Sequence, residues 1–213
     1  MCIRDRAERT GEIKPLGNWV FRQACTQLLA WEDDHGLADV SISCNVSAHQ
    51  FDDQEFLTEL RSAISGRGID PSRIIIEVTE SALSGPHVAD HLNEIRRLGY
   101  RVAIDDFGAG YANLAQLVSM PFDILKVDSG LVRNLENTGP TETNAVDILM
   151  AIGAIAGTRG TPVICEGIET EEQRQLLVKA NISHLQGWIF SRSVRPENVA
   201  DLVPGAIELD AAA

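Results

Sequence analysis

Short apolar runs alternate with helical patterns along most of the chain, and this alternation constrains the fold more than any other feature of the sequence. The runs predict strands over 40–44, 73–78, 101–104, 122–127, 162–165 and 184–185, and a final run over 188–190 is a candidate for a further strand. Ile74-Ile75-Ile76 and Val163-Ile164 are apolar on both faces, as in parallel strands that helices cover on both sides. Repeated β–α units predict a parallel sheet, either open and doubly wound or closed into a barrel.

Helical periodicity fills the intervals between these runs. The clearest helix is predicted just before Gly99, which is placed to end it. Its apolar residues recur at helical spacing: Val88, Leu92, Ile95 and Leu98. Thr170 begins a capping box with Gln173 and predicts a helix through Leu177. Similar apolar stripes predict helices over 15–31, 56–64 and 145–155.

Length and charge limit the classes of protein that this chain can belong to. A chain of 213 residues suits a single domain with a substantial core. A net charge of −13 argues against nonspecific binding to a nucleic-acid polymer or to anionic lipid. An anionic ligand would bind only where metal ions or a local basic group reverse the field. No apolar run approaches the roughly 18 residues of a membrane span.

The termini and the cysteines complete this outline. Residues 1–6 have neither helical nor strand periodicity, and we treat them as a candidate non-native leader. We expect one domain over 7–204 and a small tail over 205–213. The four cysteines lack CxxC spacing, which indicates reduced, buried thiols in a cytoplasmic protein. The polar stretch 134–143 is expected to be a surface loop.

Polar side chains stand at the ends of the predicted strands. In chain order they are Asn45, Glu77, Asp105 with Asp106, Lys126 with Asp128, Glu166 and Gln186. The intervals between them are 20 to 40 residues, the length of β–α units. Six successive units that place polar groups at the same end fit the C-terminal face of a (β/α)8 barrel. An open sheet would instead concentrate them at one switch point.

These residue types indicate a site for hard divalent cations. Carboxylates and an asparagine oxygen suit Mg²⁺ or Mn²⁺ better than zinc, and they suffice for two ions, as in phosphodiester cleavage. Asp105 and Asp106 can share a site only where the pleat breaks, and Gly108 and Gly110 are placed to break it. Lys126 is the one cation of the set and could contact a phosphoryl oxygen or relay a proton from water.

Each of these residues also has a simpler structural interpretation. The acid pair could cap a loop, Asn45 could form a turn, and Gln186 could make ordinary loop hydrogen bonds. Glu77 with Glu80 could open a helix, Lys126 with Asp128 could be a surface pair, and Glu166 with Glu169 could favour a helix N-terminus.

Six ordered motifs then resemble a known family. They are Asn45-Val46-Ser47-Ala48-His49-Gln50-Phe51, Glu77-Val78-Thr79-Glu80, Asp105-Asp106-Phe107-Gly108-Ala109-Gly110-Tyr111, Leu125-Lys126-Val127-Asp128, Glu166-Gly167-Ile168-Glu169-Thr170 and Gln186-Gly187-Trp188-Ile189-Phe190-Ser191. Their order and spacing, from about Ala7 to Pro196, resemble the EAL-domain family. Members of that family are bacterial phosphodiesterases that open cyclic di-GMP to the linear dinucleotide pGpG.

The resemblance implies a role for each site residue. Asn45, Glu77 and Asp105 would ligate one divalent ion, and Asp105 would bridge to a second ion that Asp106 and Glu166 complete.

The remaining motif residues would act around these ions. Lys126 would contact the water or the phosphate, and Gln186 would orient the water or a ligand of the ion. Glu80, Asp128 and Glu169 would support the site and its loops. The loop after Asp106 would join the site to a homodimer interface.

The family's first strand carries a Glu-Ala-Leu motif, which this sequence lacks. The segment Ala7-Glu8-Arg9-Thr10-Gly11 resembles the part that follows that strand. We therefore expect a TIM-like barrel of EAL type, truncated at its N-terminus, whose function is metal-dependent hydrolysis of cyclic di-GMP. The alternative is a catalytically degenerate module that binds the dinucleotide or serves as an interaction surface. A third alternative is an unrelated Mg²⁺-dependent barrel enzyme that acts on another phosphate ester.

Overall fold

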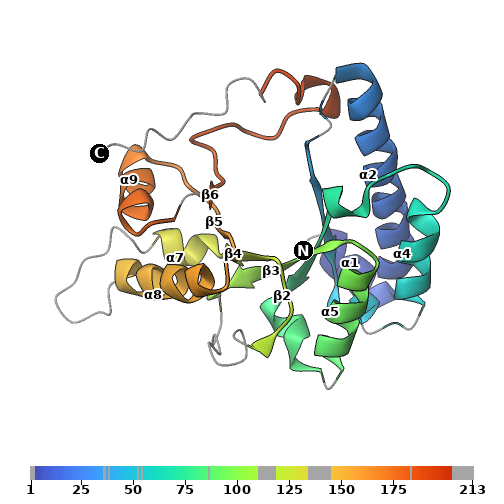
Figure 1. Ribbon diagram of the computed structural model, residues 1–213, viewed down its shortest axis with the longest axis horizontal. Helices are drawn as coiled ribbons and strands as arrows, with labels where there is room; N and C mark the ends of the chain where they lie inside the picture. The colour runs from blue at the N-terminus through green and yellow to red at the C-terminus, as the bar shows by residue number, and fades with distance from the viewer. Residues whose placement is uncertain are drawn as a thin grey trace. The chain divides into compact units, whose positions relative to one another are not determined.

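The computed structural model has an α/β fold (Figure 1). It describes residues 3–35, 37, 39–51, 53, 55–85, 87–109, 119–133, 145–182 and 184–202. The chain divides into two compact units. The first unit comprises Met1–Phe107 and Ala112–Ile124, and the second comprises Gly108–Tyr111 and Leu125–Ala213.

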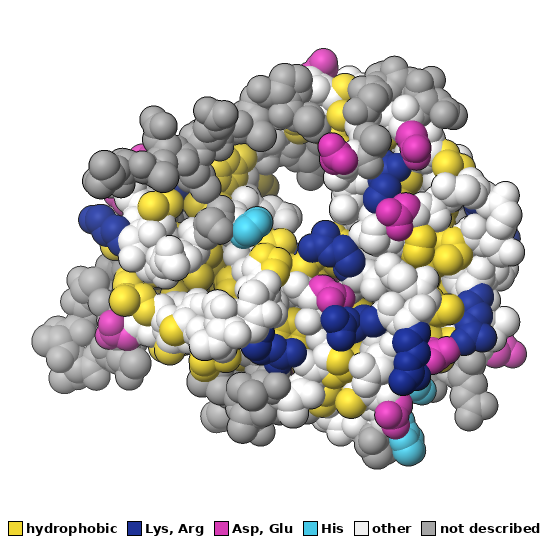
Figure 2. Space-filling model, in the orientation of Figure 1, with side chains coloured by type: hydrophobic (Ala, Val, Ile, Leu, Met, Phe, Trp, Pro, Cys, Tyr) yellow, Lys and Arg dark blue, Asp and Glu magenta, His cyan; other side chains and the backbone are white. Residues whose placement is uncertain are grey.

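The first unit contains three parallel strands in chain order: β1 (Ile42–Val46), β2 (Ile74–Thr79) and β3 (Arg101–Phe107). Its helices are α1 (Ile3–Thr10), α2 (Ile13–His35), α3 (Ala48–Phe51), α4 (Phe56–Ile64) and α5 (Val88–Arg97), with 3-10 turns η1 (Pro71–Arg73) and η2 (Glu80–Ser84). Gly99 follows α5 with a φ of 93°, which confirms its predicted place at the end of that helix. On the face shown in Figure 2, acidic and basic side chains are interspersed over this unit.

The second unit also has its strands in chain order and parallel. They are β4 (Ile124–Val127), which belongs to this unit from Leu125 onward, β5 (Val163–Cys165) and β6 (His184–Leu185). Its helices are α7 (Ser129–Arg133), α8 (Ala145–Thr158) and α9 (Glu171–Lys179), with the 3-10 turn η4 (Pro196–Asn198). Thr170 and Gln173 form the predicted capping box at the start of α9.

The central strand of the first unit is buried on both faces. Ile74, Ile76 and Val78 on one face are fully buried, and Ile75 and Glu77 on the other face are buried as well, as the apolar sequence of this strand predicts for a parallel strand under helices. In the second unit Val163 is buried, whereas Ile164 is half-buried.

Cys25, Cys44 and Cys165 are buried free thiols, as predicted, and Cys2 lies outside the described residues. Burial raises the pKa of Cys44 and Cys165 to about 12, so both thiols are protonated at neutral pH. No helix in the part of the chain that the structure describes is long and apolar enough to cross a membrane.

Several predicted boundaries are wrong, and each error has a local cause. β1 and β3 extend beyond the predicted runs and include Asn45 and the acid pair, because pairing with β2 continues through these residues. Residues 188–190 form a turn, not a strand. Ile3–Thr10 is a helix whose Ala7 is buried, although residues 1–6 showed no helical period. The predicted loop over 134–143, the tail over 205–213, and Gly110 through Asn113 lie outside the described residues.

Candidate active site

In the first unit, the predicted ligands Asn45, Glu77 and Asp105 lie on one face of the sheet. Asn45 and Glu77 are register partners, and Asn45 Nδ2 donates a hydrogen bond to Glu77 Oε2 at 3.2 Å. The register partner of Glu77 on β3 is Ala103, and Asp105 is two residues further along that strand. Because side chains alternate with a period of two, Asp105 shares the face of Glu77. Glu77 and Asp105 are only 3% and 7% exposed.

Asp106 has a left-handed backbone, with a φ of 55°. This conformation interrupts the regular alternation of β3 at the acid pair itself. The interruption comes two residues before Gly108, the first of the two glycines at which the sequence predicts the break. Gly108 also has a positive φ of 93°. Asp106 is exposed while Asp105 is buried. The backbone therefore departs from the regular pleat between the two acids.

The Asn45 side chain has a second partner, which the sequence did not suggest. Arg4 Nη1 donates to Asn45 Oδ1 at 3.2 Å, and Arg4 Nη2 donates to the carbonyl oxygen of Val46 at 3.3 Å. The sequence does not indicate Arg4, because residues 1–6 show no periodicity that would place a helix beside the strand of Asn45. Glu80 is the first residue of η2, which contacts β3, while the loop that Glu80 was predicted to hold lies outside the described residues.

In the second unit, Lys126 and Glu166 form an ion pair, with Nζ and Oε1 2.6 Å apart. Lys126 is the register partner of Ile164, and Glu166 is two residues beyond Ile164. Both side chains therefore leave the sheet on the same face. Lys126 is only 7% exposed, so the carboxylate of Glu166 offsets the cost of burying its charge.

Asp128 and Glu169 lie at the starts of helices. Asp128 Oδ1 accepts the backbone N–H of Gly130 at 2.7 Å and so shapes the entry to α7. The backbone N–H of Glu169 donates to Gln173 Oε1 at 2.9 Å, which ties Glu169 to the capping box of α9.

The loops that follow β5 and β6 are joined by two backbone hydrogen bonds. Ile168 N–H donates to Gln186 O and Ile189 N–H donates to Ile168 O, both at 3.1 Å. A Cβ at Gly187 would lie 2.0 Å from Ile168 O, so only glycine fits this approach. Gln186 and Trp188 are thereby held beside the loop that carries Glu166.

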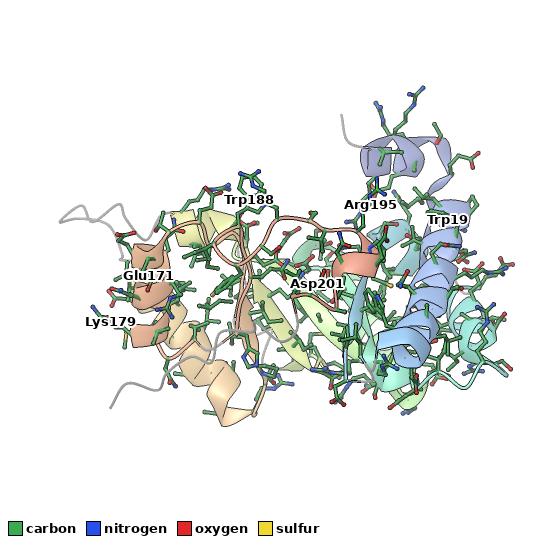
Figure 3. The ribbon with its side chains drawn as sticks, turned by 90° about the horizontal axis from the view of Figure 1, so that it is seen from above. Trp19, Glu171, Lys179, Trp188, Arg195 and Asp201 are labelled. Atoms are coloured by element: carbon green, nitrogen blue, oxygen red, sulfur yellow. The ribbon has the colours of Figure 1, made fainter. Side chains whose placement is uncertain are left out.

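A cavity of about 530 Å³ opens beside these loops within the second unit. Glu166, Glu169 and Gln186 line it, and so do three residues that the sequence did not assign to the site: Arg133, Trp188 and Arg192. Trp188 is marked in Figure 3 and is 61% exposed. A large aromatic residue that follows Gln186-Gly187 is its signal in the sequence, although the apolar run over 188–190 predicts a strand.

The donor set of the first unit fits a hard divalent cation. Two buried carboxylates and one amide oxygen on a single face provide oxygen ligands of the kind that Mg²⁺ and Mn²⁺ prefer. Among the described residues, no group of three His, Cys, Asp or Glu side chains could by itself hold a metal ion.

Comparison with known proteins gives the class of the fold. The sequence matches the EAL domain family over residues 3–193. The protein is 34% identical over 195 residues to MucR of Pseudomonas aeruginosa, a bifunctional diguanylate cyclase/cyclic di-GMP phosphodiesterase. The matched region covers 91% of this chain and 28% of MucR.

Solved structures agree with this class. The structure resembles the MucR phosphodiesterase in complex with c-di-GMP with a TM-score of 0.84 and 33% identity, covering 92% of this chain and 78% of that one. It also resembles BlrP1 of Klebsiella pneumoniae in a manganese/cyclic di-GMP complex, with a TM-score of 0.70 and 27% identity. This match covers 90% of the present chain and 46% of the BlrP1 chain.

These findings define a domain with the TIM-barrel-like α/β fold of cyclic di-GMP phosphodiesterases. The chain belongs to the EAL domain family. It spans about a quarter of the length of the first curated relatives that it matches.

Proposed function

We propose that this chain hydrolyses cyclic di-GMP to the linear dinucleotide pGpG with the help of two Mg²⁺ or Mn²⁺ ions. The observation that carries the proposal is the common face of Asn45, Glu77 and Asp105 at the carboxyl ends of β1, β2 and β3. The family membership and a relative solved with manganese and cyclic di-GMP support the same chemistry.

Each predicted site residue would have its own role in binding the ions or the substrate. Asn45, Glu77 and Asp105 would hold one ion, and Asp106 and Glu166 would be further metal ligands. Divalent ions in such sites activate water and neutralise negative charge that develops on phosphoryl oxygens.

Hydrolysis breaks one of the two phosphodiester bonds of the ring. The oxygen of water adds to phosphorus, the P–O3′ bond breaks, and the 3′-oxygen leaves with a proton, which gives the linear product. Lys126, held by Glu166 at 2.6 Å, would donate to a phosphoryl oxygen or pass on a proton of the attacking water. Gln186 would orient that water, and Glu80, Asp128 and Glu169 would keep the loops in place.

The proposal extends to the setting of the domain. We propose a cytoplasmic domain over 7–204 that forms a homodimer through the loop after Asp106. A domain that binds cyclic di-GMP without cleaving it is the second candidate, because Arg4 donates to Asn45 Oδ1, the oxygen expected to bind an ion. Turnover is therefore to be compared between the full chain and a variant that lacks residues 1–6.

Conservative substitution of the acids tests the proposal. Asp105→Asn and Glu166→Gln keep the size of each side chain but remove its charge, and we expect turnover to fall more than about 100-fold, the scale of losing one key transition-state contact. Asp147→Asn on α8 and Glu172→Gln on α9, both exposed, are the matched controls and should keep full activity. Near-normal hydrolysis by either site variant with Mg²⁺ present would remove that residue from the site.

A further inference from the structure

A cavity of about 440 Å³ in the first unit is lined by none of the predicted site residues. The end of α5 and the start of β3 form its walls. Arg101, which lines the cavity, is the first residue of β3, whereas Asp105 is four residues further along the same strand. Four residues of extended chain span about 13 Å. The cavity is therefore at the opposite end of β3 from the predicted metal ligands.

The lining of this cavity is basic. Arg96, Arg97 and Arg101 contribute to it, and Asp123 is the one acid among its described lining residues. This local surplus of positive charge occurs in a chain whose net charge is −13. A local basic group of this kind is what an anionic ligand requires in an acidic protein.

Asp123 holds Arg96 in a fixed orientation. Asp123 Oδ1 accepts hydrogen bonds from Arg96 Nη2 at 2.9 Å and from Arg96 Nε at 3.1 Å, and Asp123 Oδ2 accepts the backbone N–H of Val102 at 2.9 Å. The backbone N–H of Asp123 donates in turn to Val102 O at 2.8 Å. The Arg96 guanidinium is thus tied to the start of β3, although its side chain is still 41% exposed.

Arg97 and Arg101 provide positive charge that their neighbours do not cancel. Arg97 pairs with Glu94 at 3.3 Å, but Glu94 also pairs with Arg61, so two guanidinium groups share one carboxylate. The Arg97 side chain remains 74% exposed. Within the part of the chain that the structure describes, no acid forms an ion pair with Arg101.

The position of Arg101 is what distinguishes a binding site from an ordinary helix end. Basic residues stabilise the last turn of a helix, which accounts for Arg96 and Arg97 at the end of α5 without any ligand. Arg101 lies on a strand, where this effect does not operate, and its side chain is half-buried. Like charges around one cavity repel one another, and a bound anion would relieve that repulsion.

We propose that this cavity binds a diphosphate group, either as free pyrophosphate or as the phosphates of a nucleotide. Arg97 and Arg101 donate to the phosphate oxygens, which guanidinium groups bind through two parallel hydrogen bonds. Arg96 adds charge from its fixed position, and the Asn93 amide supplies a further donor. Tyr100, the one aromatic residue described in the lining, is 2% exposed, so it offers no face on which a base could stack. The phosphates therefore carry the affinity. This site is independent of the proposed hydrolysis.

The test is calorimetric titration of the full chain with pyrophosphate, with EDTA present so that no divalent ion can bridge the ligand to the candidate active site. Arg101→Gln and Arg97→Gln should each weaken binding roughly 10- to 150-fold, the equivalent of losing a hydrogen bond between charged groups. Arg101→Lys should cause a smaller loss, because lysine keeps the charge but not the two parallel donors. Binding should also weaken as NaCl is raised.

Two arginines of the second unit provide matched controls. Arg133 lines the other basic cavity, and Arg159 is exposed after α8. Arg133→Gln and Arg159→Gln should leave the dissociation constant for pyrophosphate unchanged. Thermal unfolding supplies a second measurement: pyrophosphate should raise the Tm of the wild type and of both controls, but not that of Arg101→Gln. Because Arg97 is mostly exposed, Arg97→Gln keeps the test decisive if Arg101→Gln does not fold.

Titration with ADP distinguishes the two sources of the diphosphate. Equal affinity for ADP and pyrophosphate would assign the site to the diphosphate alone, which is the result we expect. Tighter binding of ADP that Arg101→Gln still weakens would assign it to a nucleotide. The proposal is overturned if the wild type does not bind pyrophosphate, or if Arg97→Gln and Arg101→Gln bind it as tightly as the wild type does. None of these results depends on whether the chain cleaves cyclic di-GMP.

Discussion

Asp106 shows how one residue can break a strand at the point where a site is needed. Its φ of 55° lies in the left-handed region, which costs most residues free energy but is tolerated best by glycine, asparagine and aspartate. The buried Asp105 keeps the regular geometry of β3, and its exposed neighbour departs from it.

Substitution of Asp106 separates its backbone role from its charge. Asp106→Ala should lower the free energy of unfolding by about 1–2 kcal/mol, because alanine tolerates the left-handed conformation poorly. Asp106→Asn and Asp106→Gly should retain stability to within about 0.5 kcal/mol of the wild type, since asparagine and glycine adopt this conformation more easily. Urea unfolding of the three variants measures these differences. Equal stability of all three would show that the φ of Asp106 carries no strain.

The sequence predicted which polar residues lie together in the first unit better than it predicted what surrounds the site residues of the second unit. Asn45, Glu77 and Asp105 follow apolar runs that ladder pairing places side by side, so spacing alone brought them together. Arg133, Trp188 and Arg192 stood outside any periodic pattern that points to a site. Their convergence depends on how α7 packs with the loops after β5 and β6, which spacing does not reveal.

At the scale of elements, the errors lie where tertiary contacts override local pattern. The run Trp188-Ile189-Phe190 is apolar enough for a strand, yet the hydrogen bond from Ile189 N–H to Ile168 O turns the chain. The charged pair after Ile104 suggested an early end to β3, whereas register pairing of Thr79 with Asp105 extends the strand. Patterns with a strong local signal, such as the capping box of α9, were predicted correctly.

Gly187 lies where the loops after β5 and β6 are joined. Gly187→Ala should destabilise the protein by about 1–3 kcal/mol, the usual cost of inserting a methyl group where there is no room. The added Cβ would meet a backbone oxygen at 2.0 Å, so the loops must part and both Gln186 and Trp188 must move. We therefore expect turnover to fall.

Gly157 near the end of α8 provides the control, because nothing lies within 4 Å of a Cβ placed there. Gly157→Ala should be neutral or stabilising by up to about 1 kcal/mol. Chemical denaturation and activity assays on both variants make the comparison. If Gly187→Ala is as stable and active as Gly157→Ala, the close approach to Ile168 does not hold the loops together.

At the scale of the whole molecule, the periodicity of the sequence predicts repeated β–α pairs with parallel strands. Parallel strands are present in each of the two compact units. The choice between an open sheet and a barrel came from polar residues at successive strand ends and from the family motifs, and family membership is now shown. Basic groups are present locally although the chain has a net charge of −13, since Lys126 pairs with Glu166 and two arginines line the neighbouring cavity. Periodicity could not anticipate that cavity, which is made by irregular loops.

The most direct measurement of the central claim is separation of the products after the wild-type chain is incubated with cyclic di-GMP. With Mg²⁺ or Mn²⁺ we expect one pGpG for each cyclic di-GMP consumed, no product when EDTA is in excess, and recovery when Mn²⁺ is added back. Persistence of intact cyclic di-GMP with either ion, in a chain shown by calorimetry to bind the dinucleotide, would contradict the account and favour a binding module.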